Sequence, residues 1–318
     1  MKNPDDRLET RLIHAGEPEP RFAGAVAMPI FQSSTYALDA EVGYHEIRYL
    51  RLSNSPNHLA LHDKLCAIEG GEAALCTASG MAAISTTLLA VLRAGDHLIA
   101  QRDLYGGTHA LITHDLPRYG IEHTLVDAAD PSSWAAALRP NTRAFYVEAI
   151  SNPLLRIGDL PAAAAFARER GLCSVIDATF ASPVNLRPID LGFDLVVHSC
   201  TKYLNGHTDL VAGAVIGRAE RVAGVKRLLD HLGGTLDPHA CFLLHRGLKT
   251  LALRVRHQND TALTVARFLS RHPEVAAVHY PLLEGHPDHA RARALFAGCG
   301  GVLSFELRGG VEAAERLL

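Results

Sequence analysis

A lysine stands among hydroxyl residues where an apolar run ends. The segment "HSCTKYLNGH", residues 198–207, follows "FDLVV" and precedes "LVAGAVIG". Lys202 comes directly after Thr201 and close after Ser199. A lysine at a strand end is a surface residue in many proteins. In a desolvated pocket lined with hydroxyl donors, however, its amine is suited to form an imine with an aldehyde.

Two further segments place polar groups where strands are expected to end. In "CTASGMAAISTTLLAVL", Ser79, Gly80 and Met81 lie between a strand and a helix, where free N–H groups would hold an anion such as phosphate. Glycine at such a turn also serves ordinary chain reversal. Asp177 ends the buried run "CSVID", where its carboxylate needs a cation. A helix cap or a salt bridge is the alternative role for Asp177.

These three sites together suit one ligand that carries a phosphate, a basic ring nitrogen and an aldehyde. Pyridoxal 5'-phosphate (PLP) has all three groups, and its enzymes pair a Schiff-base lysine with an acid at the pyridinium nitrogen. In "DLYGGTH", after the run "DHLIAQ", Tyr105 offers a ring that could stack on the cofactor. A buried core tyrosine is the alternative. The sequence therefore predicts PLP as the cofactor.

The elements that must position these residues form an alternating pattern from about residue 57. Short apolar runs such as "IEHTLVD", "RAFYVEAI", "CSVIDA", "DLVVHS" and "AGAVIG" are separated by helical stretches. The pattern predicts an α/β fold with a mostly parallel seven-stranded sheet and helices on both faces. In such sheets the ligand lies beyond the carboxyl ends of the strands.

Three regions are expected along the chain. Residues 1–56 form an N-terminal arm, residues 57–232 a PLP-binding domain, and residues 233–318 an α+β C-terminal domain. The last region opens with one long helical stretch, "CFLLHRGLKTLALRVRHQNDTALTVARFLSRH". It stops at "GVEAAERLL" without a capping glycine or asparagine, so we expect this domain to be truncated.

Composition narrows the possible partners and the compartment. The net charge is −3 and no basic block occurs, so we expect neither nucleic acid nor a membrane as a partner. The 6 cysteines include no Cys-x-x-Cys pair and no apolar signal segment opens the chain, which favours a cytoplasmic location. His58 and His62 are four residues apart, but no third ligand is evident, so we expect an ordinary amphipathic helix without a metal.

Several segments together resemble one enzyme family. They are "TRLIHAGE", "MPIFQSSTY", "TASGMAAI", "DLYGGT", "SNP", "IDATFASP", "HSCTKYLNGHTDLVAGAV" and "RGLKTLALR". They resemble the PLP-dependent enzymes of cysteine and methionine metabolism. These trans-sulfuration enzymes include cystathionine γ-synthase, cystathionine β- and γ-lyase, methionine γ-lyase and the O-acylhomoserine sulfhydrylases. The resemblance covers nearly the whole chain and implies the PLP-dependent transferase fold type I.

The resemblance implies a role for each matching residue. Lys202 would hold PLP and then shuttle protons, and Tyr105 would stack on the ring as the second candidate catalytic residue. The remaining implied cofactor contacts are the phosphate-binding group Ser79, Gly80, Met81, Ser199 and Thr201, then Asp177 at the ring nitrogen and Asn152 at the ring hydroxyl. Tyr49 and Arg51, in "YLRLSN", match a Tyr-x-Arg motif that reaches the phosphate of the partner subunit. A homodimer or homotetramer with shared active sites is therefore expected.

The expected activity is that of a carbon–sulfur lyase that cleaves cystathionine or a related sulfur amino acid by β- or γ-elimination. The alternatives are a γ-replacement reaction of the synthase or sulfhydrylase type, and a non-catalytic truncated paralogue that binds PLP. Gly107 stands where methionine γ-lyases carry a cysteine, which argues against that specialisation. The serine and arginine with which the family binds the substrate carboxylate, late in the C-terminal domain, have no counterparts in this sequence.

Overall fold

A seven-stranded sheet forms the centre of the molecule. The computed structural model describes residues 6–37, 43–44 and 47–318. The strands are β1 Ala73–Thr77, β2 His97–Gln101, β3 Glu122–Val126, β4 Thr142–Glu148, β5 Cys173–Asp177, β6 Leu195–Ser199 and β7 Gly213–Gly217. They lie in the order β1-β7-β6-β5-β4-β2-β3, and only β7 runs antiparallel to its neighbours within this sheet. The predicted mostly parallel seven-stranded sheet is thereby confirmed.

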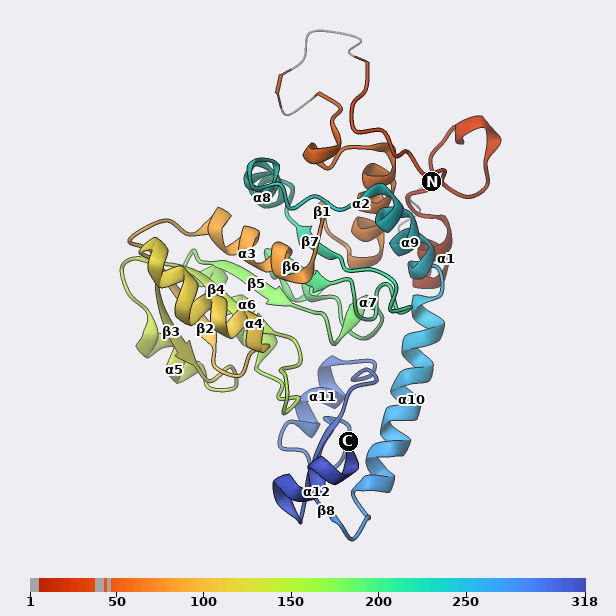
Figure 1. The fold of residues 1–318 in the computed structure, drawn as a ribbon. Helices are drawn as coiled ribbons and strands as arrows, with labels where there is room; N and C mark the ends of the chain where they lie inside the picture. The colour runs from red at the N-terminus through yellow and green to blue at the C-terminus, as the bar shows by residue number, and fades with distance from the viewer. Residues whose placement is uncertain (1–5, 38–42, 45–46) are drawn as a thin grey trace.

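Helices cover both faces of this sheet (Figure 1). One face packs against α3 Gly80–Val91 and α8 Ala219–Leu232, and the other against α2 Pro56–Glu69, α6 Leu160–Glu169 and α9 Pro238–Leu248. Every residue of β2, β5 and β7 is buried. Strands covered on both sides need apolar residues at successive positions, which is why their sequences are continuous apolar runs rather than alternating ones.

Shorter helical elements connect and flank these layers. They are α1 Leu8–His14, α4 Gly106–Ala110, α5 Pro131–Ala137 and α7 Ser182–Asn185, with further helical turns at Phe22–Gly24, Leu50–Leu52, Leu111–Asp115, Leu116–Tyr119 and Pro188–Leu191. The last part of the chain consists of α10 Leu251–Leu269, β8 Val275–His279, α11 His289–Leu295, β9 Ser304–Leu307 and α12 Gly310–Leu317. Strands β8 and β9 form a separate antiparallel pair, and α10 connects them to the central part (Figure 1).

The single long helical stretch expected after residue 240 is wrong, because α9 ends at Leu248 and α10 begins at Leu251. Thr250 has φ −109° and ψ 6°, outside the helical region. The guanidinium of Arg254 donates to the carbonyl of Gly247 at 2.8 Å. It thus satisfies an acceptor that a continuous helix would have used. Apolar periodicity alone does not reveal such a break.

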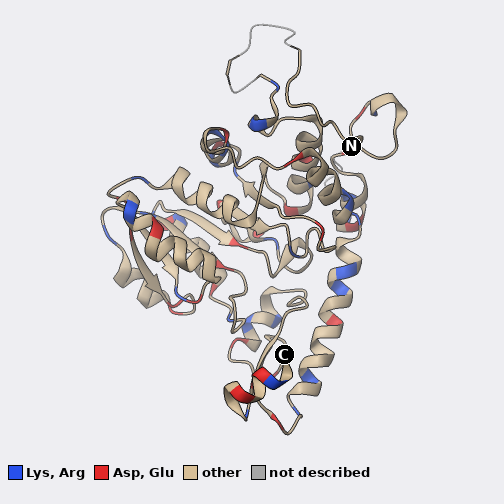
Figure 2. Ribbon diagram, viewed as in Figure 1, with Lys and Arg blue, Asp and Glu red and all other residues tan. Residues whose placement is uncertain are grey.

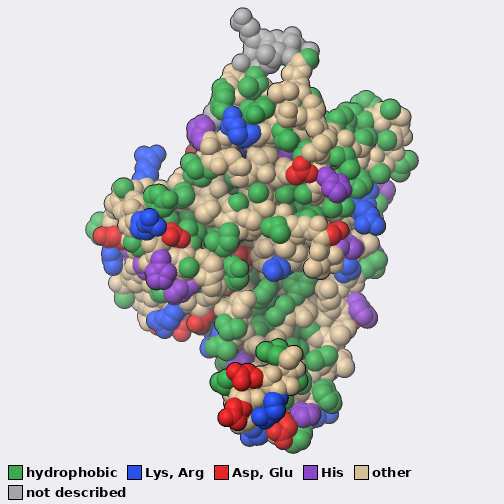
Figure 3. All heavy atoms as spheres, in the orientation of Figure 1, with side chains coloured by type: hydrophobic (Ala, Val, Ile, Leu, Met, Phe, Trp, Pro, Cys, Tyr) green, Lys and Arg blue, Asp and Glu red, His purple; other side chains and the backbone are tan. Residues whose placement is uncertain are grey.

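Charged residues of both signs are distributed along the whole ribbon (Figure 2). Over the described part of the chain, no helix is long and apolar enough to cross a membrane. Hydrophobic side chains gather on the visible surface between the sheet and the C-terminal elements (Figure 3).

Candidate active site

A cavity of about 460 Å³ opens where β1, β4, β5 and β6 end. Strand β1 is parallel to β6 because both are antiparallel to β7, and Thr77 and Ser199 both lie opposite Gly213. The carboxyl ends of these strands therefore meet at one edge of the sheet, as the sequence predicts. Nine of the predicted site residues line this cavity: Ser79, Gly80, Met81, Tyr105, Asn152, Asp177, Ser199, Thr201 and Lys202.

The turn before α3 is shaped to receive an anion. Ser79 caps the helix, since its hydroxyl accepts the N–H of Ala82 at 3.0 Å. A Cβ placed on Gly80 would lie 2.7 Å from the Cβ of Ser199, so only glycine lets this turn approach β6 so closely. The first N–H groups of a helix have no acceptor within it, and they carry the positive end of the helix dipole. The amides of Gly80 and Met81 are thus suited to a phosphate beside Ser199.

Two carboxylates end neighbouring strands beside this turn. Glu148 and Asp177 are register partners on β4 and β5, and both are buried. Asp177 accepts the N–H of Thr179 at 2.8 Å, and Glu148 accepts the N–H of Tyr105 at 2.8 Å. Burial raises the pKa of Asp177, and burial together with the Asp177 charge raises the pKa of Glu148. Among the described residues, no lysine or arginine pairs with either carboxylate.

A cationic ring nitrogen at Asp177 would supply the missing partner, so the cavity fits PLP on this count. The alternative interpretation, in which Asp177 forms a salt bridge, is wrong for the described residues of the chain. Glu148 was missed in the sequence. The signal for it was present, since Glu148 ends "RAFYVE" just as Asp177 ends "CSVID".

Lys202 belongs to a tight turn that follows β6. Its N–H donates to the carbonyl of Ser199 at 3.1 Å, and its carbonyl accepts the N–H of Gly206 at 2.8 Å. The side chain of Lys202 is exposed in the single chain. The desolvated surroundings expected for its amine are therefore not supplied by the described residues of one chain.

Arg254, on α10, holds this turn from outside. Its Nη1 donates to the carbonyl of Tyr203 at 2.9 Å, and its Nη2 donates to that of Leu204 at 3.4 Å. Three carbonyl groups, including that of Gly247, thus share one guanidinium. Sequence reasoning missed this function because the arginine lies far along the chain, in a segment expected to be ordinary helix.

The hydroxyl of Thr201 is hydrogen-bonded to the backbone, so it is not free to donate to a ligand. Its hydroxyl donates to the carbonyl of Ala212 at 3.3 Å and accepts the N–H of the same residue at 3.1 Å. These two bonds join the start of the turn to the segment that leads into β7. Thr201 lines the cavity, but its hydroxyl would have to rotate to reach a phosphate.

Tyr105 is 50% exposed, so the alternative of a buried core tyrosine is wrong. The residue lines the cavity, and its backbone is held by Glu148. A Cβ on Gly107 would lie 2.8 Å from Cε1 of the Tyr105 ring and 3.1 Å from Sδ of Met81. Glycine at position 107 therefore allows the ring to take this place.

Tyr49 and Arg51 do not line the cavity of their own chain. Arg51 donates to the hydroxyl of Tyr44 at 2.6 Å and to the carbonyl of Asp230, and its guanidinium lies 5.4 Å from the centre of the Tyr49 ring. The structure thus groups these two residues with each other, apart from the other nine. Their contact with a partner subunit stays a prediction.

A second cavity, of about 840 Å³, lies next to the first. It shares Phe180, Thr201, Lys202, Val211 and Val302 with the first cavity and extends to Gln258 and Asp209. Lys202 is the only cationic side chain among the described residues that line either space. The lysine thus lies between the pocket suited to PLP and a second space that a substrate could occupy.

Comparisons with known proteins agree with this arrangement. A probable cystathionine γ-synthase of Herpetosiphon aurantiacus is 43% identical over 315 residues, which are 99% of this chain and 98% of the relative. An L-methionine γ-lyase of Porphyromonas gingivalis is 42% identical over 97% of this chain and 80% of its own length. The cystathionine β-lyase MetC of Bacillus subtilis is 40% identical over 98% of this chain and 79% of its own length.

Solved structures agree as well. The crystal structure of metB from Corynebacterium glutamicum superposes with a TM-score of 0.94 at 35% identity, covering 98% of this chain and 82% of that one. Cystathionine γ-lyase from Lactobacillus plantarum, complexed with L-serine, gives a TM-score of 0.90 at 38% identity, over 95% of this chain and 79% of that one. These matches confirm the fold type I architecture of the trans-sulfuration enzymes.

The model of one family matches residues 9–318, nearly the whole chain. Relatives with synthase and lyase names are about equally similar, at 40% to 43% identity, so the comparisons support the family rather than one reaction within it. The chain belongs to the Cys/Met metabolism PLP-dependent enzyme family.

Proposed function

We propose that this chain is a PLP-dependent carbon–sulfur lyase that cleaves cystathionine or a related sulfur amino acid by β- or γ-elimination. The observation that carries the proposal is the grouping of Lys202, Asp177, Tyr105 and the Gly80 turn around one cavity at the strand ends. The cytoplasmic location and the division into an arm, a PLP-binding domain and a C-terminal domain belong to the same proposal.

Each residue has a stated task in this proposal. The amides of Gly80 and Met81 and the hydroxyls of Ser199 and, after rotation, Thr201 bind the phosphate, with Ser79 holding the turn as helix cap. Asp177 accepts the ring N–H and keeps that nitrogen protonated. Tyr105 stacks on the ring, and Asn152 donates to the ring oxygen.

Bound PLP supplies an electron sink that stabilises negative charge on the carbon next to the amino group. Lys202 first holds the cofactor, and its Nζ then takes the proton from that carbon and returns a proton further along the side chain. A sulfur leaving group can then depart from the β or γ carbon. Each substrate molecule, together with one water molecule that supplies the keto oxygen, yields one thiol, one 2-oxo acid and one ammonium ion.

The active unit in this proposal is at least a homodimer. Tyr49 and Arg51 would reach the phosphate in the partner subunit. The open side of Lys202 supports this view, since a second chain could cover what one chain leaves exposed. A homotetramer would be a pair of such dimers.

A γ-replacement reaction is the second candidate. It is supported by the probable cystathionine γ-synthase of Herpetosiphon aurantiacus, which this chain matches over nearly the full length of both proteins. Gly107 supports neither of these two reactions over the other, although it argues against a methionine γ-lyase. A non-catalytic paralogue that binds PLP is the third candidate, because Lys202 is the single cation among the described residues around both cavities.

The visible absorbance spectrum of the purified protein tests these candidates, with Lys202→Ala as the control. A lyase shows a cofactor band that depends on Lys202 and changes when cystathionine is added, with thiol and 2-oxo acid released in equal amounts. An intact amino acid as product, formed from an O-acylhomoserine and a thiol, would support replacement instead. A Lys202-dependent band that does not change when any sulfur amino acid is added would support the third candidate, the non-catalytic paralogue.

A further inference from the structure

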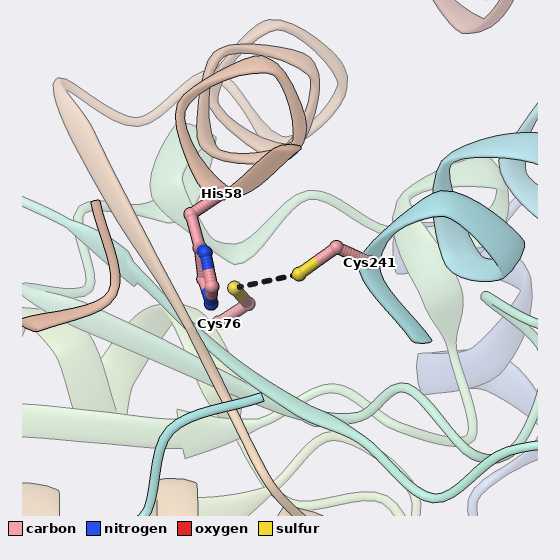
Figure 4. Close-up of side chains that lie close together, drawn as sticks. All are labelled: His58, Cys76 and Cys241. Atoms are coloured by element: carbon pink, nitrogen blue, oxygen red, sulfur yellow. Dashed lines mark hydrogen bonds between the residues drawn. The ribbon is translucent and has the colours of Figure 1, made fainter. Parts of the chain in front are cut away.

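Two cysteines and a histidine from distant parts of the chain converge beneath the sheet, outside the residues that line the active-site cavities. His58 lies on α2, Cys76 on β1 and Cys241 on α9, and Figure 4 shows their side chains pointing toward one another. All three residues are completely buried. One potential ligand atom from each lies within 4.8 Å of the other two. The two sulfur atoms are 4.0 Å apart.

His62 adds a fourth potential ligand. It follows His58 by one turn of α2, and its Nε2 lies 3.2 Å from the sulfur of Cys76. His62 is half-buried, whereas His58 is fully buried, so His62 occupies the side of the group that is nearer to solvent.

The distances suit tetrahedral coordination. Zinc binds thiolate sulfur at about 2.3 Å and imidazole nitrogen at about 2.0–2.1 Å, which places two sulfur ligands roughly 3.8 Å apart and a sulfur and a nitrogen roughly 3.6 Å apart. The observed separations are 4.0 Å between the sulfurs and 3.2 Å between Cys76 Sγ and His62 Nε2. The ligand atoms of His58, Cys76 and Cys241 already lie within 4.8 Å of one another, whereas His62 is outside this group of three and would have to turn toward the ion.

The surroundings suit a neutral metal centre. The cluster lies among apolar side chains that include Leu61, Leu65, Leu236 and Leu244. Two thiolates there would be costly alone, but a divalent ion with two thiolates and neutral imidazoles carries no net charge. His58 Nδ1 lies 2.7 Å from the hydroxyl of Ser55, an outer partner of the kind that orients metal-bound histidines.

Metal binding has a defined local cost. His58 Nε2 now lies 2.8 Å from the carbonyl of Leu236, and His62 Nε2 accepts the N–H of Cys76 at 3.0 Å. Both rings must give up these partners to bind an ion. Two thiol protons leave at the same time, so the site takes up metal with release of protons.

We propose that Cys76, Cys241, His58 and His62 form a binding site for a thiophilic d¹⁰ cation, for which Zn²⁺ is the natural probe. The site joins strand β1 of the central sheet to helices α2 and α9, which pack against each other on one face of that sheet. It is separate from the catalytic proposal, because none of its four residues lines either cavity around Lys202. The pair His58 and His62, whose spacing alone did not predict a metal, gains its missing ligands only through the fold.

The test is cobalt titration of the reduced PLP-loaded protein, because Co²⁺ in a tetrahedral site with sulfur ligands shows thiolate charge-transfer bands. We expect one Co²⁺ per chain with these bands, displaced by Zn²⁺. Cys76→Ala and Cys241→Ala should each lower the intensity of the bands, because one of the two thiolate ligands is lost, and His62→Ala should weaken binding by about tenfold or more. Cys173→Ala is the matched control, a buried thiol of the same sheet, and should bind as the unchanged protein does.

X-ray absorption on zinc-loaded unchanged protein keeps the test decisive if the variants fail to fold. A shell of two sulfur atoms at about 2.3 Å supports the site. A shell of nitrogen and oxygen alone would assign the metal to surface histidines and overturn the proposal. So would charge-transfer bands of unchanged intensity without Cys76, or no metal uptake by the fully reduced protein. Loss of the catalytic activity proposed above would leave these readouts unchanged.

Discussion

At the scale of single residues, close contacts with neighbouring atoms restrict which amino acids can occupy several positions. At position 80 only glycine lets the first turn of α3 approach Ser199 so closely, and glycine at position 107 leaves room for the ring of Tyr105. Asp177 and Glu148 hold buried carboxylates without a described lysine or arginine partner. Glycine is required at the first two positions because a larger side chain would collide with a neighbour. The two buried carboxylates, in contrast, lack a cationic partner among the described residues.

Gly107→Ala should weaken PLP retention by several-fold, because the new Cβ would lie 2.8 Å from the Tyr105 ring and displace it. The change can be followed as the dissociation constant for PLP, measured by absorbance. Gly106→Ala is the matched control, since a Cβ there meets nothing within 4 Å. Equal affinities in the two variants would show that the position of the ring does not depend on Gly107.

At the scale of elements, the ends of neighbouring strands and the turn after β6 form the site. The parallel register of β4 and β5 sets Glu148 beside Asp177. Arg254 of α10 binds the carbonyls of the Lys202 turn and the end of α9. The side chain of Arg254 thus links elements that are far apart in the sequence by binding their backbone carbonyl groups.

Glu148→Gln should make the stability of the cofactor-free protein less sensitive to pH. Burial and Asp177 raise the pKa of Glu148, so the folded protein keeps a proton that the unfolded chain releases. The free energy of unfolding must then fall as pH rises above the ordinary carboxylic range. Glutamine can still accept the N–H of Tyr105 but does not titrate, so this part of the slope should vanish.

Denaturant unfolding at a series of pH values measures this difference. The unchanged protein should lose more stability than Glu148→Gln between acidic and neutral pH. Adding PLP should reduce the loss in the unchanged protein, since a protonated ring nitrogen favours the Asp177 carboxylate. Identical slopes for the two proteins would contradict the raised pKa of Glu148.

Arg254→Lys should destabilise the fold by about 1–3 kcal/mol, because three carbonyl groups lose a shared charged donor that a single ammonium cannot replace. Arg256→Lys is the control on the same helix. Arg256 pairs with Glu9 near the surface, where such pairs contribute about 0–1 kcal/mol. Thermal or denaturant unfolding distinguishes the two, and similar losses would refute the anchoring role of Arg254.

At the scale of the whole molecule, two cavities meet at Lys202 and two residues of the expected site lie elsewhere. Tyr49 and Arg51 are held with Tyr44 and Asp230 of their own chain. The proposed shared active site therefore requires a second copy of the chain. In a twofold symmetric dimer each copy would complete the site of the other.

Mixing Arg51→Ala with Lys202→Ala tests this assembly. Each variant alone should be nearly inactive, since every site lacks one of the two residues. If the site is shared, half of randomly mixed dimers are mixed pairs with one intact site, and about a quarter of the original activity should return. Co-expression with two affinity tags isolates the mixed pairs. No recovery in isolated mixed pairs would place both residues in the same site of one chain.

The sequence by itself determined the α/β class, the PLP requirement and most of the residues around the cavity. It did so because buried parallel strands are continuous apolar runs, and a lysine, an acid or a glycine turn at their ends stands out. Only the tertiary structure decided the break at Thr250, the function of Arg254, the pairing of Glu148 with Asp177 and the convergence of His58, Cys76 and Cys241. Each of these depends on contacts between segments that are far apart in the sequence. The pattern of apolar residues along a sequence does not reveal which segments will come into contact.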